Sequence, residues 1–449
     1  MAKALRDPEE VYGKSLEDGL AFYNPWWTGK VPEYLVKEYR RDVFYRIKGY
    51  LDINRIIAIK GPRRVGKTSL MYQLIEDLLE TTPANRIMYA PFDDVKIRDF
   101  DAVIDYYERM ILKESLGERQ VYLFLDEAQF LPGWENQVKK YYDRNYPIKF
   151  IVSGSSATLI KKNTESLMGR TVEETILPFS FKDMLQYKLK EKITLNMEET
   201  DIVKIKKYEK DARIVFDEYL LKGGFPNIFE VTETDLWQKL VKEDIIDKAL
   251  YRDIVTLYDI KRPEILEKLF LYLAGINGQI LDVSNVSSSL GLSREYISKY
   301  VQYLKNAYLL IGLRKYSNSI EKTVRSNEKT YVTDPGIVNA LLNRKKLEDD
   351  ETGRMVEAVI AAHLYGKEYY YWRDRYEVDF IVKSPEGSLP IEVKYKNQVR
   401  KKDLSGLLEY MRKNEVKEGM VVTKDYSGEE EIEGRRIKYV PTWRFLIGM

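Results

Sequence analysis

The stretch IAIKGPRRVGKTS, residues 57–69, decides the fold of the first part of the chain. Its apolar start predicts a buried strand, and the residues that follow Lys67 have the periodicity of a helix. Between the two, Gly61 and Gly66 bound a loop with the pattern G-x-x-x-x-G-K-[ST]. Glycines allow backbone N–H groups to close around a phosphate, and the start of the helix adds a favourable dipole. The stretch therefore predicts a phosphate-binding loop after a strand.

This loop predicts ATP with Mg²⁺ as the cofactor. Lys67 is expected to reach the β- and γ-phosphates, and the Thr68 hydroxyl is expected to ligate Mg²⁺. The alternative is a glycine turn formed by chance, and the strand and helix on either side argue against it. The predicted nucleotide-binding residues of the loop are Gly61, Pro62, Arg63, Arg64, Val65, Gly66, Lys67, Thr68 and Ser69.

A second motif supplies acids. The apolar run 121–125 ends in Asp126 and Glu127, so a buried strand delivers two carboxylates at its carboxyl end. We expect Asp126 to bind the Mg²⁺ of the nucleotide and Glu127 to be catalytic, by orienting or deprotonating the attacking water. One predicted strand, residues 86–91, separates the two motifs along the chain. This order favours the P-loop class with an inserted central strand, as in AAA-type and RecA-like ATPases.

Composition bounds the classes of function. A chain of 449 residues exceeds one ordinary domain, and 44% hydrophobic with 32% charged residues is typical of a folded protein. The 73 Lys and Arg nearly balance the 71 Asp and Glu, so overall charge does not indicate nucleic acid. Cysteine is absent and the single histidine, His363, is expected in the core, so any metal must use oxygen ligands. Without a signal core or membrane-length apolar stretch, we expect a cytoplasmic protein with no membrane partner.

The alternation of strand and helix patterns predicts an α/β fold of several domains. We expect a P-loop ATPase core at residues 1–180 with a parallel sheet, a helical lid at 181–263, a winged helix at 264–325 and a nuclease-like α/β domain at 326–449. The strands predicted for the core are residues 55–60, 86–91, 121–125, 149–153 and 172–177.

The winged-helix pattern rests on two short helical stretches that meet at residues 291–293, followed by an apolar strand at 308–313. Ser293 is a good N-cap for the second helix. Its predicted apolar face is Tyr296, Ile297, Tyr300, Val301 and Leu304. The opposite face consists of Arg294, Ser298, Lys299, Gln302 and Lys305. These side chains suit a DNA major groove, so DNA is a candidate partner; the alternative is a unit that only packs between domains.

Acids recur near the end of the chain. Asp379 lies in the strand pattern EVDFIV, and Glu392 and Lys394 share one face of the next strand, IEVKY. With Glu357 on the preceding helix they form the PD-(D/E)xK pattern, in which acids bind Mg²⁺ and the lysine supports phosphodiester cleavage. We therefore predict metal ligands at Glu357, Asp379 and Glu392 and a catalytic Lys394. The alternatives are a solvated charged face, or a nuclease fold that binds DNA without cutting it.

Several motifs together carry a resemblance to a family. NPWW, GPRRVGKTS, LDEAQ, SGSSA, MGR, PFSF and GGFP, followed by EVDFIV and IEVKY, resemble archaeal AAA-type ATPases of the MalT/NACHT/STAND-related branch with a PD-(D/E)xK nuclease-like C-terminal domain. The resemblance implies an ATPase coupled to a nucleic-acid-facing nuclease-like domain. The rival function is a STAND-like switch whose last domain does not cleave.

The resemblance also implies roles for single residues. Arg170 stands where AAA-type proteins carry an arginine finger that acts on a neighbouring subunit, which would require a homo-oligomer; a surface salt bridge is the alternative. Ser153 or Ser155 would take the sensor position, with a helix cap as the alternative. Pro226, in the lid motif GGFP, and the Asn24-Pro25 pair would approach the adenine.

Overall fold

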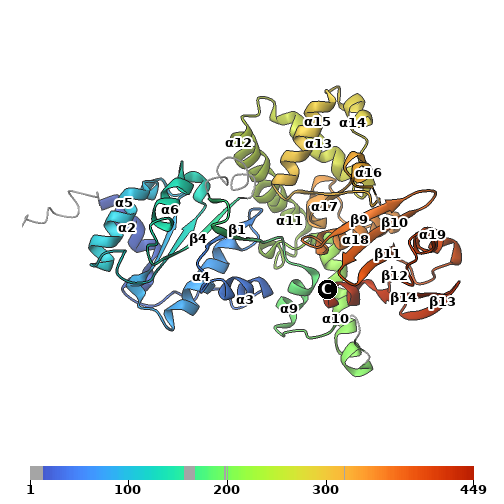
Figure 1. Cartoon of the computed structure of the whole chain (residues 1–449), viewed down its shortest axis with the longest axis horizontal. Coiled ribbons are helices and arrows are strands. Elements are labelled where there is room, and N and C mark those ends of the chain that lie inside the picture. The colour runs from blue at the N-terminus through green and yellow to red at the C-terminus, as the bar shows by residue number, and fades with distance from the viewer. Residues whose placement is uncertain (1–13, 156–166, 197–198, 200, 318) are drawn as a thin grey trace, which may run out of the picture. The chain divides into compact units, whose positions relative to one another are not determined.

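The computed structural model of the chain describes residues 14–155, 167–196, 199, 201–317 and 319–449 (Figure 1). The chain divides into two compact units, Met1–Leu177 and Pro178–Met449. Among the described residues, no helix has the length and apolar character needed to cross a membrane.

A five-stranded, fully parallel sheet forms the centre of the first unit, in the order β2-β3-β4-β1-β5. Its strands are β1 (Ile56–Gly61), β2 (Ile87–Pro91), β3 (Val121–Asp126), β4 (Ile148–Ser155) and β5 (Thr171–Thr175). The five predicted strands are confirmed, with small shifts at their ends. Because β4 lies between β1 and β3, the sheet has the inserted central strand predicted for this class. The α/β P-loop fold is therefore confirmed.

Helices cover this sheet. They are α2 (Lys14–Tyr23), α3 (Asp42–Gly49), α4 (Lys67–Leu79), α5 (Phe100–Tyr106), which continues as a π-helix η4 (Tyr107–Leu112), and α6 (Trp134–Tyr142). One apolar core includes Leu20 of α2, Phe100 of α5 and Val138 of α6, packed with Leu123 and Leu125 of β3. Burial of such side chains stabilises the unit by about 1.5–3 kcal/mol for each large residue. The core fixes the ends of β1 and β3, where the two predicted motifs lie.

The NPWW motif covers the exposed edge of the sheet at β2. The Asn24 amide donates to Tyr89 O at 2.8 Å and accepts from Tyr89 N–H at 2.7 Å, as a neighbouring strand would. The indoles of Trp26 and Trp27 both donate to Ile87 O. Since the second N–H of the Asn24 amide is bonded to Leu20 O, this side chain is fully used inside the fold. The Asn24 side chain is therefore not available for the expected adenine contact, and the motif protects a sheet edge. A contact through Pro25 stays a prediction.

The second unit begins with helices, as expected. They are α9 (Phe181–Leu189), α10 (Ile202–Lys222), α11 (Thr234–Leu240), the π-helix η7 (Val241–Val255) and α12 (Thr256–Tyr258). Three further helices follow, α13 (Pro263–Gly275), α14 (Val283–Leu290) and α15 (Arg294–Asn306). A small antiparallel sheet, ordered β6-β8-β7, completes this part with β6 (Gln279–Ile280), β7 (Leu310–Leu313) and β8 (Lys329–Val332). Its middle strand, β8, lies beyond residue 325, where we expected the winged helix to end.

The buried face of α15 differs from the predicted face at one position. Ile297 and Leu304 are buried as predicted, but Tyr296 is 56% exposed. Tyr303 is buried in its place and stacks on Tyr258, with 3.6 Å between ring centroids. The prediction for Tyr296 was wrong because the helix turns its apolar face so that Tyr303 packs against Tyr258 of α12.

The glycine pair of GGFP has a structural role in this unit. Gly224 N–H donates to Asp334 Oδ2 at 2.7 Å, and Asp334 also caps α17 (Pro335–Leu341) through the N–H groups of Gly336 and Ile337. A Cβ at Gly224 would lie 2.1 Å from Phe179 O, so only glycine allows this close approach. The motif therefore ties the end of α10 to α17.

A six-stranded mixed sheet, ordered β13-β14-β12-β11-β10-β9, closes the chain. Its strands are β9 (Tyr369–Arg373), β10 (Glu377–Ser384), β11 (Gly387–Lys394), β12 (Glu418–Thr423), β13 (Gly428–Ile432) and β14 (Arg435–Pro441). The helices of this part are α18 (Asp349–His363), α19 (Ser405–Lys413) and α20 (Thr442–Gly448), while the short α16 (Ile320–Arg325) lies between β7 and β8. β10 and β11 contain the strand patterns predicted around Asp379 and Glu392.

His363 is half-buried, and both of its ring nitrogens are hydrogen-bonded to the backbone of the second unit. Its Nδ1–H donates to Val359 O at 2.7 Å, and Nε2 accepts from Phe181 N–H at 2.8 Å. These two bonds define the neutral tautomer and join the end of α18 to the start of α9. Burial lowers the pKa of His363 to about 4, so the ring stays neutral at pH 7.

Candidate functional site

The phosphate loop connects the carboxyl end of β1 to the start of α4. Gly61 has a φ of +155°, and a Cβ there would lie 2.1 Å from Ile176 O, so the loop requires glycine at this point. Gly66 has a φ of 95° directly before α4. The Lys67 side chain is only 5% exposed, and its ammonium donates to Gly61 O at 3.1 Å and Pro62 O at 2.9 Å. The lysine is therefore held over the loop that is expected to receive phosphate.

Asp126 brings the two predicted motifs together. Its Oδ2 accepts from the Thr68 hydroxyl at 2.7 Å and from the Tyr89 hydroxyl at 2.7 Å, and its Oδ1 accepts from the Ser153 hydroxyl. The carboxylate is 2% exposed. A hydroxyl and a carboxylate in contact are oxygen donors of the kind that Mg²⁺ prefers beside nucleotide phosphates. Thr68 and Asp126 therefore fit the predicted Mg²⁺.

Glu127 is held in an unusual backbone conformation. Its φ is 50°, which non-glycine residues seldom adopt, and its N–H contacts Asp126 Oδ1 at 3.1 Å and Ser153 Oγ at 3.3 Å. The Gln129 side chain donates to Glu127 Oε2. Burial raises the pKa of Glu127, and the Lys67 ammonium partly offsets the rise. A positioned carboxylate with a raised pKa is suited to general base chemistry.

Two residues of this site were not predicted from the sequence. Tyr89, on β2, donates to Asp126, and its ring lies 4.8 Å from the Tyr72 ring of α4. Burial, and next the Asp126 carboxylate, raise the pKa of Tyr89 well above its usual value, so the phenol stays protonated and donates. The position of Tyr89 near the carboxyl end of a strand next to β3 was the available signal.

Ser153 contacts the two acids of the candidate site, whereas Arg170 lies elsewhere in the same unit. Ser153 is fully buried, and its hydroxyl holds Asp126 and the Glu127 N–H. Arg170 precedes β5 and pairs with Asp143 at 2.7 Å. β5 runs parallel to β1, so Arg170 and the phosphate loop lie at opposite ends of the sheet, roughly 17 Å apart for five residues of strand. Arg170 therefore does not serve its own loop, and a role toward a neighbouring subunit stays a prediction. The side chain of Ser155 lies outside the described residues.

Pro226, the adenine contact predicted in the lid motif GGFP, belongs to the second unit. It begins a short 3₁₀-helix (Pro226–Ile228) after the glycine pair and is half-buried. Its approach to the adenine stays a prediction.

The acids of the C-terminal sheet surround a lysine that the sequence did not point to. Lys329, on β8, is 3% exposed, and its ammonium lies 2.7 Å from Glu357 Oε1, 2.7 Å from Glu377 Oε1 and 3.7 Å from Asp379 Oδ1. The Tyr331 hydroxyl also donates to Glu357 Oε1 at 2.7 Å. Although burial lowers it, the three carboxylates raise the pKa of Lys329 above its ordinary value, so the side chain carries a positive charge.

The other two predicted residues form a separate pair. Lys394 contacts Glu392 on the same face of β11, and Asp379 Oδ2 accepts from Val393 N–H at 2.8 Å. Glu392 Oε2 is buried and has no hydrogen-bond partner in the described part of the chain. Burial, and next the Asp379 carboxylate, raise the pKa of Glu392 well above its usual value and that of Glu357 to about 7. Glu392 and Glu357 can therefore take up protons, which neutralise the negative charge that Lys329 and Lys394 do not compensate.

This arrangement does not fit the metal predicted at Glu357, Asp379 and Glu392. No group of three or more acidic or histidine side chains in the described ranges is placed to hold a metal ion. The physical reason is the Lys329 ammonium, which occupies the position between Glu357 and Asp379 and uses their oxygens. The acids occur in the predicted order along the chain, but the cation beside Glu357 and Asp379 is the Lys329 ammonium rather than a metal ion.

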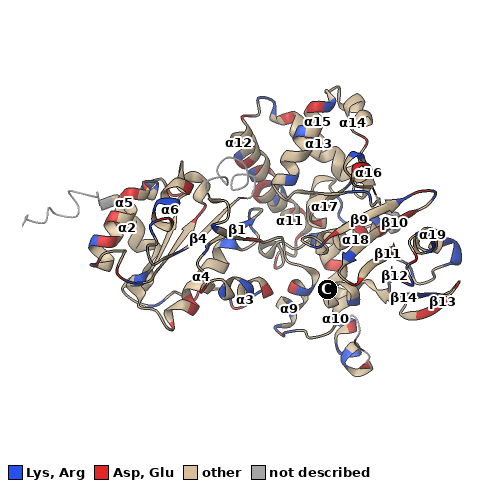
Figure 2. Cartoon of the chain, viewed as in Figure 1, with Lys and Arg blue, Asp and Glu red and all other residues tan. Residues whose placement is uncertain are grey.

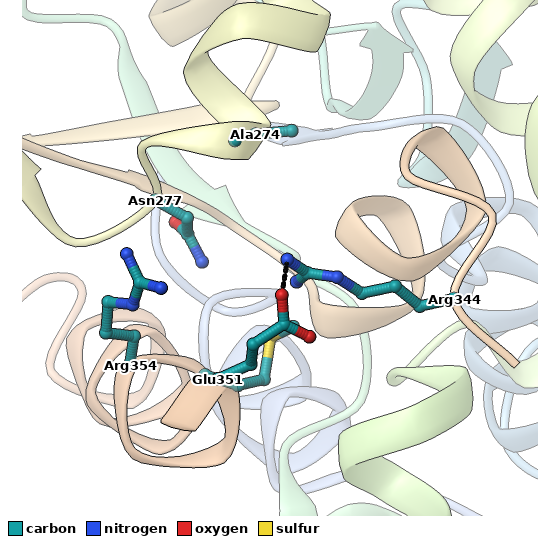
Figure 3. Close-up of a pocket in the computed structure, with 7 residues that line it drawn as sticks. Ala274, Asn277, Arg344, Glu351 and Arg354 are labelled. Carbon is teal, nitrogen blue, oxygen red and sulfur yellow. Dashed lines mark hydrogen bonds and ion pairs between the residues drawn. The ribbon is translucent and has the colours of Figure 1, made fainter. Parts of the chain in front are cut away.

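Two other features of the second unit were candidates for binding. On α15, Arg294, Ser298, Lys299 and Gln302 are exposed, whereas Lys305 is half-buried and pairs with Glu328 at 2.8 Å. Figure 2 colours the charged positions along the backbone, those of α15 included. A pocket of about 20 Å³ lies between α13 and α18, where Arg344 pairs with Glu351 (Figure 3). That volume admits about one water molecule and excludes a nucleotide.

Comparison with known proteins agrees with the first unit. Residues 53–185 match the family described as AAA domain. Together with the sheet order, this match makes the first unit a P-loop domain of the AAA type. Residues 213–348 and 352–445 match two families described as domains of unknown function, DUF8612 and DUF4143. Lys329 thus comes from one matched segment and its carboxylate partners from the next.

Relatives occur in bacteria and archaea. An uncharacterized protein of Haemophilus influenzae is 25% identical, over 90% of this chain and 98% of its own. Two uncharacterized proteins of Methanocaldococcus jannaschii are 29% and 26% identical, over 73% and 88% of this chain and 72% and 85% of their own. The AMPPCP-bound DnaA of Aquifex aeolicus has a TM-score of 0.27 at 16% identity, over 60% of this chain and 89% of its own. A TM-score this low does not support a fold assignment, so the assignment rests on the sheet order and on the AAA match.

Proposed function

We propose that the first unit binds and hydrolyses ATP, and that this cycle is coupled to a second unit that faces nucleic acid. The observation that carries the proposal is the contact of Thr68 with Asp126 beside Glu127, at the mouth of the phosphate loop. A chance glycine turn would not bring the hydroxyl, the two acids and Lys67 to one end of the sheet.

Each residue then has a defined part in hydrolysis. Thr68 and Asp126 would hold Mg²⁺, which would neutralise phosphate charge during the reaction. Lys67 exchanges its bonds to the loop carbonyls for bonds to phosphate. Glu127 orients the attacking water and takes its proton, and its raised pKa increases its strength as a base. Ser153 and Tyr89 keep Asp126 in place.

The proposal for the second unit rests on its helices and small sheet. The three helices α13, α14 and α15, together with the three-stranded antiparallel sheet, support a winged helix, and the exposed side chains of α15 support a contact with DNA. The acid pattern of β10 and β11 supports a nuclease-like ancestry, without a divalent ion at the acids.

A specific observation favours the rival function, a STAND-like switch whose last domain does not cleave. Lys329 fills the acid site, so the cluster joins β8 to α18 and β10 as a structural ionic contact. In this function ATP occupancy changes the assembly of the chain, and the second unit binds without cutting.

Calorimetric titration of MgATP into the full chain tests nucleotide binding. Wild-type protein should bind, and Lys67→Ala should lose most of the affinity while its second unit unfolds at the wild-type temperature. Lys48→Ala, at an exposed position of α3, is the matched control. Equal affinity in Lys67→Ala and wild type would overturn the proposal. Turnover that DNA stimulates favours the coupled ATPase, and nucleotide-dependent assembly without DNA favours the switch.

A further inference from the structure

A cavity in the second unit lies beside α16. It has a volume of about 710 Å³, within the range of about 300–1,000 Å³ typical of ligand sites. It is formed where α16, the end of β9 and the end of α19 meet. The lining residues are Lys315, Tyr316, Ser317, Glu321, Lys322, Arg325, Ser326, Trp372, Arg373, Asp374, Lys413 and Asn414.

The lining is strongly basic. It carries five Lys and Arg against two acids, although the whole chain has a net charge of only +2. Lys315 and Lys322 form no ion pair with the described residues, whereas Glu321 holds Arg325 at 2.9 Å and Asp374 holds Lys413. The two acids therefore position two cations, and Arg373 lies 3.9 Å from Glu377, which is outside the lining. Lys315 and Lys322 are left to attract an anion. Positive charge gathered in a hollow raises the local concentration of polyanions.

Aromatic and apolar groups lie beside these cations. The Tyr316 ring borders the cavity with the Lys383 ammonium 4.4 Å from its centroid, and Trp372 forms part of the floor. On α16, Ile320 is 83% exposed and Val324 is 65% exposed, one turn apart on the same helix that supplies Lys322. A phosphate binder alone has no need of such surfaces, whereas unpaired bases stack on aromatic and apolar side chains.

We propose that this cavity binds single-stranded nucleic acid. The backbone phosphates lie along Lys315, Lys322 and Arg373, and the bases rest on Tyr316 and the exposed apolar side chains of α16. A duplex keeps its bases stacked inside and has no use for these surfaces, so the single strand is the favoured ligand. The inference rests on the proposed nucleic-acid-facing role of the second unit. It places the main contact with nucleic acid in this cavity rather than on α15.

Fluorescence anisotropy with a labelled oligothymidine strand and a matched duplex tests the inference on the full chain. The variant is Lys315→Glu with Lys322→Glu, which reverses two cations without touching the core. The control is Arg294→Glu with Lys299→Glu, which makes the same charge change on exposed α15. Thermal unfolding should show that both variants keep wild-type stability.

We expect the cavity variant to bind the single strand at least about tenfold more weakly and its salt dependence to fall by about 0.7 per lost phosphate contact. The α15 control should bind the strand like wild type. Equal loss in both variants, or release of the strand by poly-glutamate at an equal charge concentration, would overturn the inference by revealing non-specific attraction. If the single strand binds wild type and the cavity variant equally, the cavity is not the binding site, although the proposed nucleic-acid role of the second unit still stands. If neither strand nor duplex binds wild type, both the cavity and the proposed nucleic-acid role fail.

Discussion

The ammonium of Lys329 lies 2.7 Å from Glu357 Oε1, inside the second unit and out of contact with water. Lys329 comes from the small sheet and Glu357 from α18, so the contact joins two parts of the unit that match different families. In a nuclease of this pattern the acids would face a metal ion, whereas here they face a charged side chain. Whether Lys329 or a metal ion pairs with these acids therefore decides between a second unit that does not cleave DNA and one that does.

Removing that ammonium should leave uncompensated carboxylates. Lys329→Met is expected to lower the stability of the second unit by about 3–5 kcal/mol, the cost of breaking one side of a buried ion pair. Millimolar Mn²⁺ should restore part of the lost stability, because a divalent ion can then approach Glu357 and Asp379. Thermal unfolding with and without Mn²⁺ measures both effects.

The matched control is Lys322→Met, which removes an exposed lysine and should change stability little. Wild-type protein should neither gain stability from Mn²⁺ nor nick supercoiled DNA with it. Stabilisation of the wild type by Mn²⁺, together with nicking that Asp379→Asn abolishes, would show that Lys329 yields to a metal.

Glu127 is expected to act as the base of hydrolysis. Glu127→Gln keeps the size of the side chain and should bind MgATP normally, but it should hydrolyse ATP at least about a hundred times more slowly. Single-turnover hydrolysis after mixing with radiolabelled ATP separates binding from chemistry. The exposed Glu118→Gln serves as a control and should turn over at the wild-type rate. Normal turnover in Glu127→Gln would assign the base to another residue.

Arg170 allows a test of action between subunits. If it reaches the nucleotide of a neighbour, Arg170→Ala and Lys67→Ala should each be inactive alone, and mixing them should restore part of the ATPase activity. Each mixed interface then pairs an intact loop with an intact arginine. A proven oligomer that shows no rescue would leave Arg170 as the surface partner of Asp143.

His363 gives the second unit a defined acid sensitivity. Its pKa is lowered from 6.5 to about 4, so the fold favours the neutral ring. The stability that it contributes is fully present above pH 6.5 and is lost as the pH falls through about 4. The loss should reach about 3 kcal/mol, since one pKa unit corresponds to about 1.4 kcal/mol. Asp183 opposes the shift and Lys367 adds to it.

The chain has one histidine, so the NMR signal of a ¹³C-labelled ring reports His363 alone. We expect it to titrate near pH 4, with His363→Gln losing this part of the acid sensitivity of unfolding. A midpoint near 6.5 would mean that the ring is solvated.

The parts that could be predicted from the sequence are those encoded by neighbouring residues. The phosphate loop and the acids after β3 each combine a local motif with one strand, and the parallel sheet brings them together. Lys329 could not be predicted, because it looks like a solvated lysine until β8 turns it toward α18 and β10. Tyr89 escaped for the same reason, since only the order of the sheet places it beside Asp126. Tyr296 was misplaced because α15 is rotated by its packing against Tyr258.

Steady-state ATP hydrolysis by the full chain, measured with Mg²⁺ in the presence and absence of single-stranded and duplex DNA, tests the central claim most directly. The account predicts Mg²⁺-dependent turnover that single-stranded DNA raises several-fold and that Glu127→Gln abolishes. A folded wild-type protein that binds MgATP but shows no turnover, with or without either DNA, would contradict it.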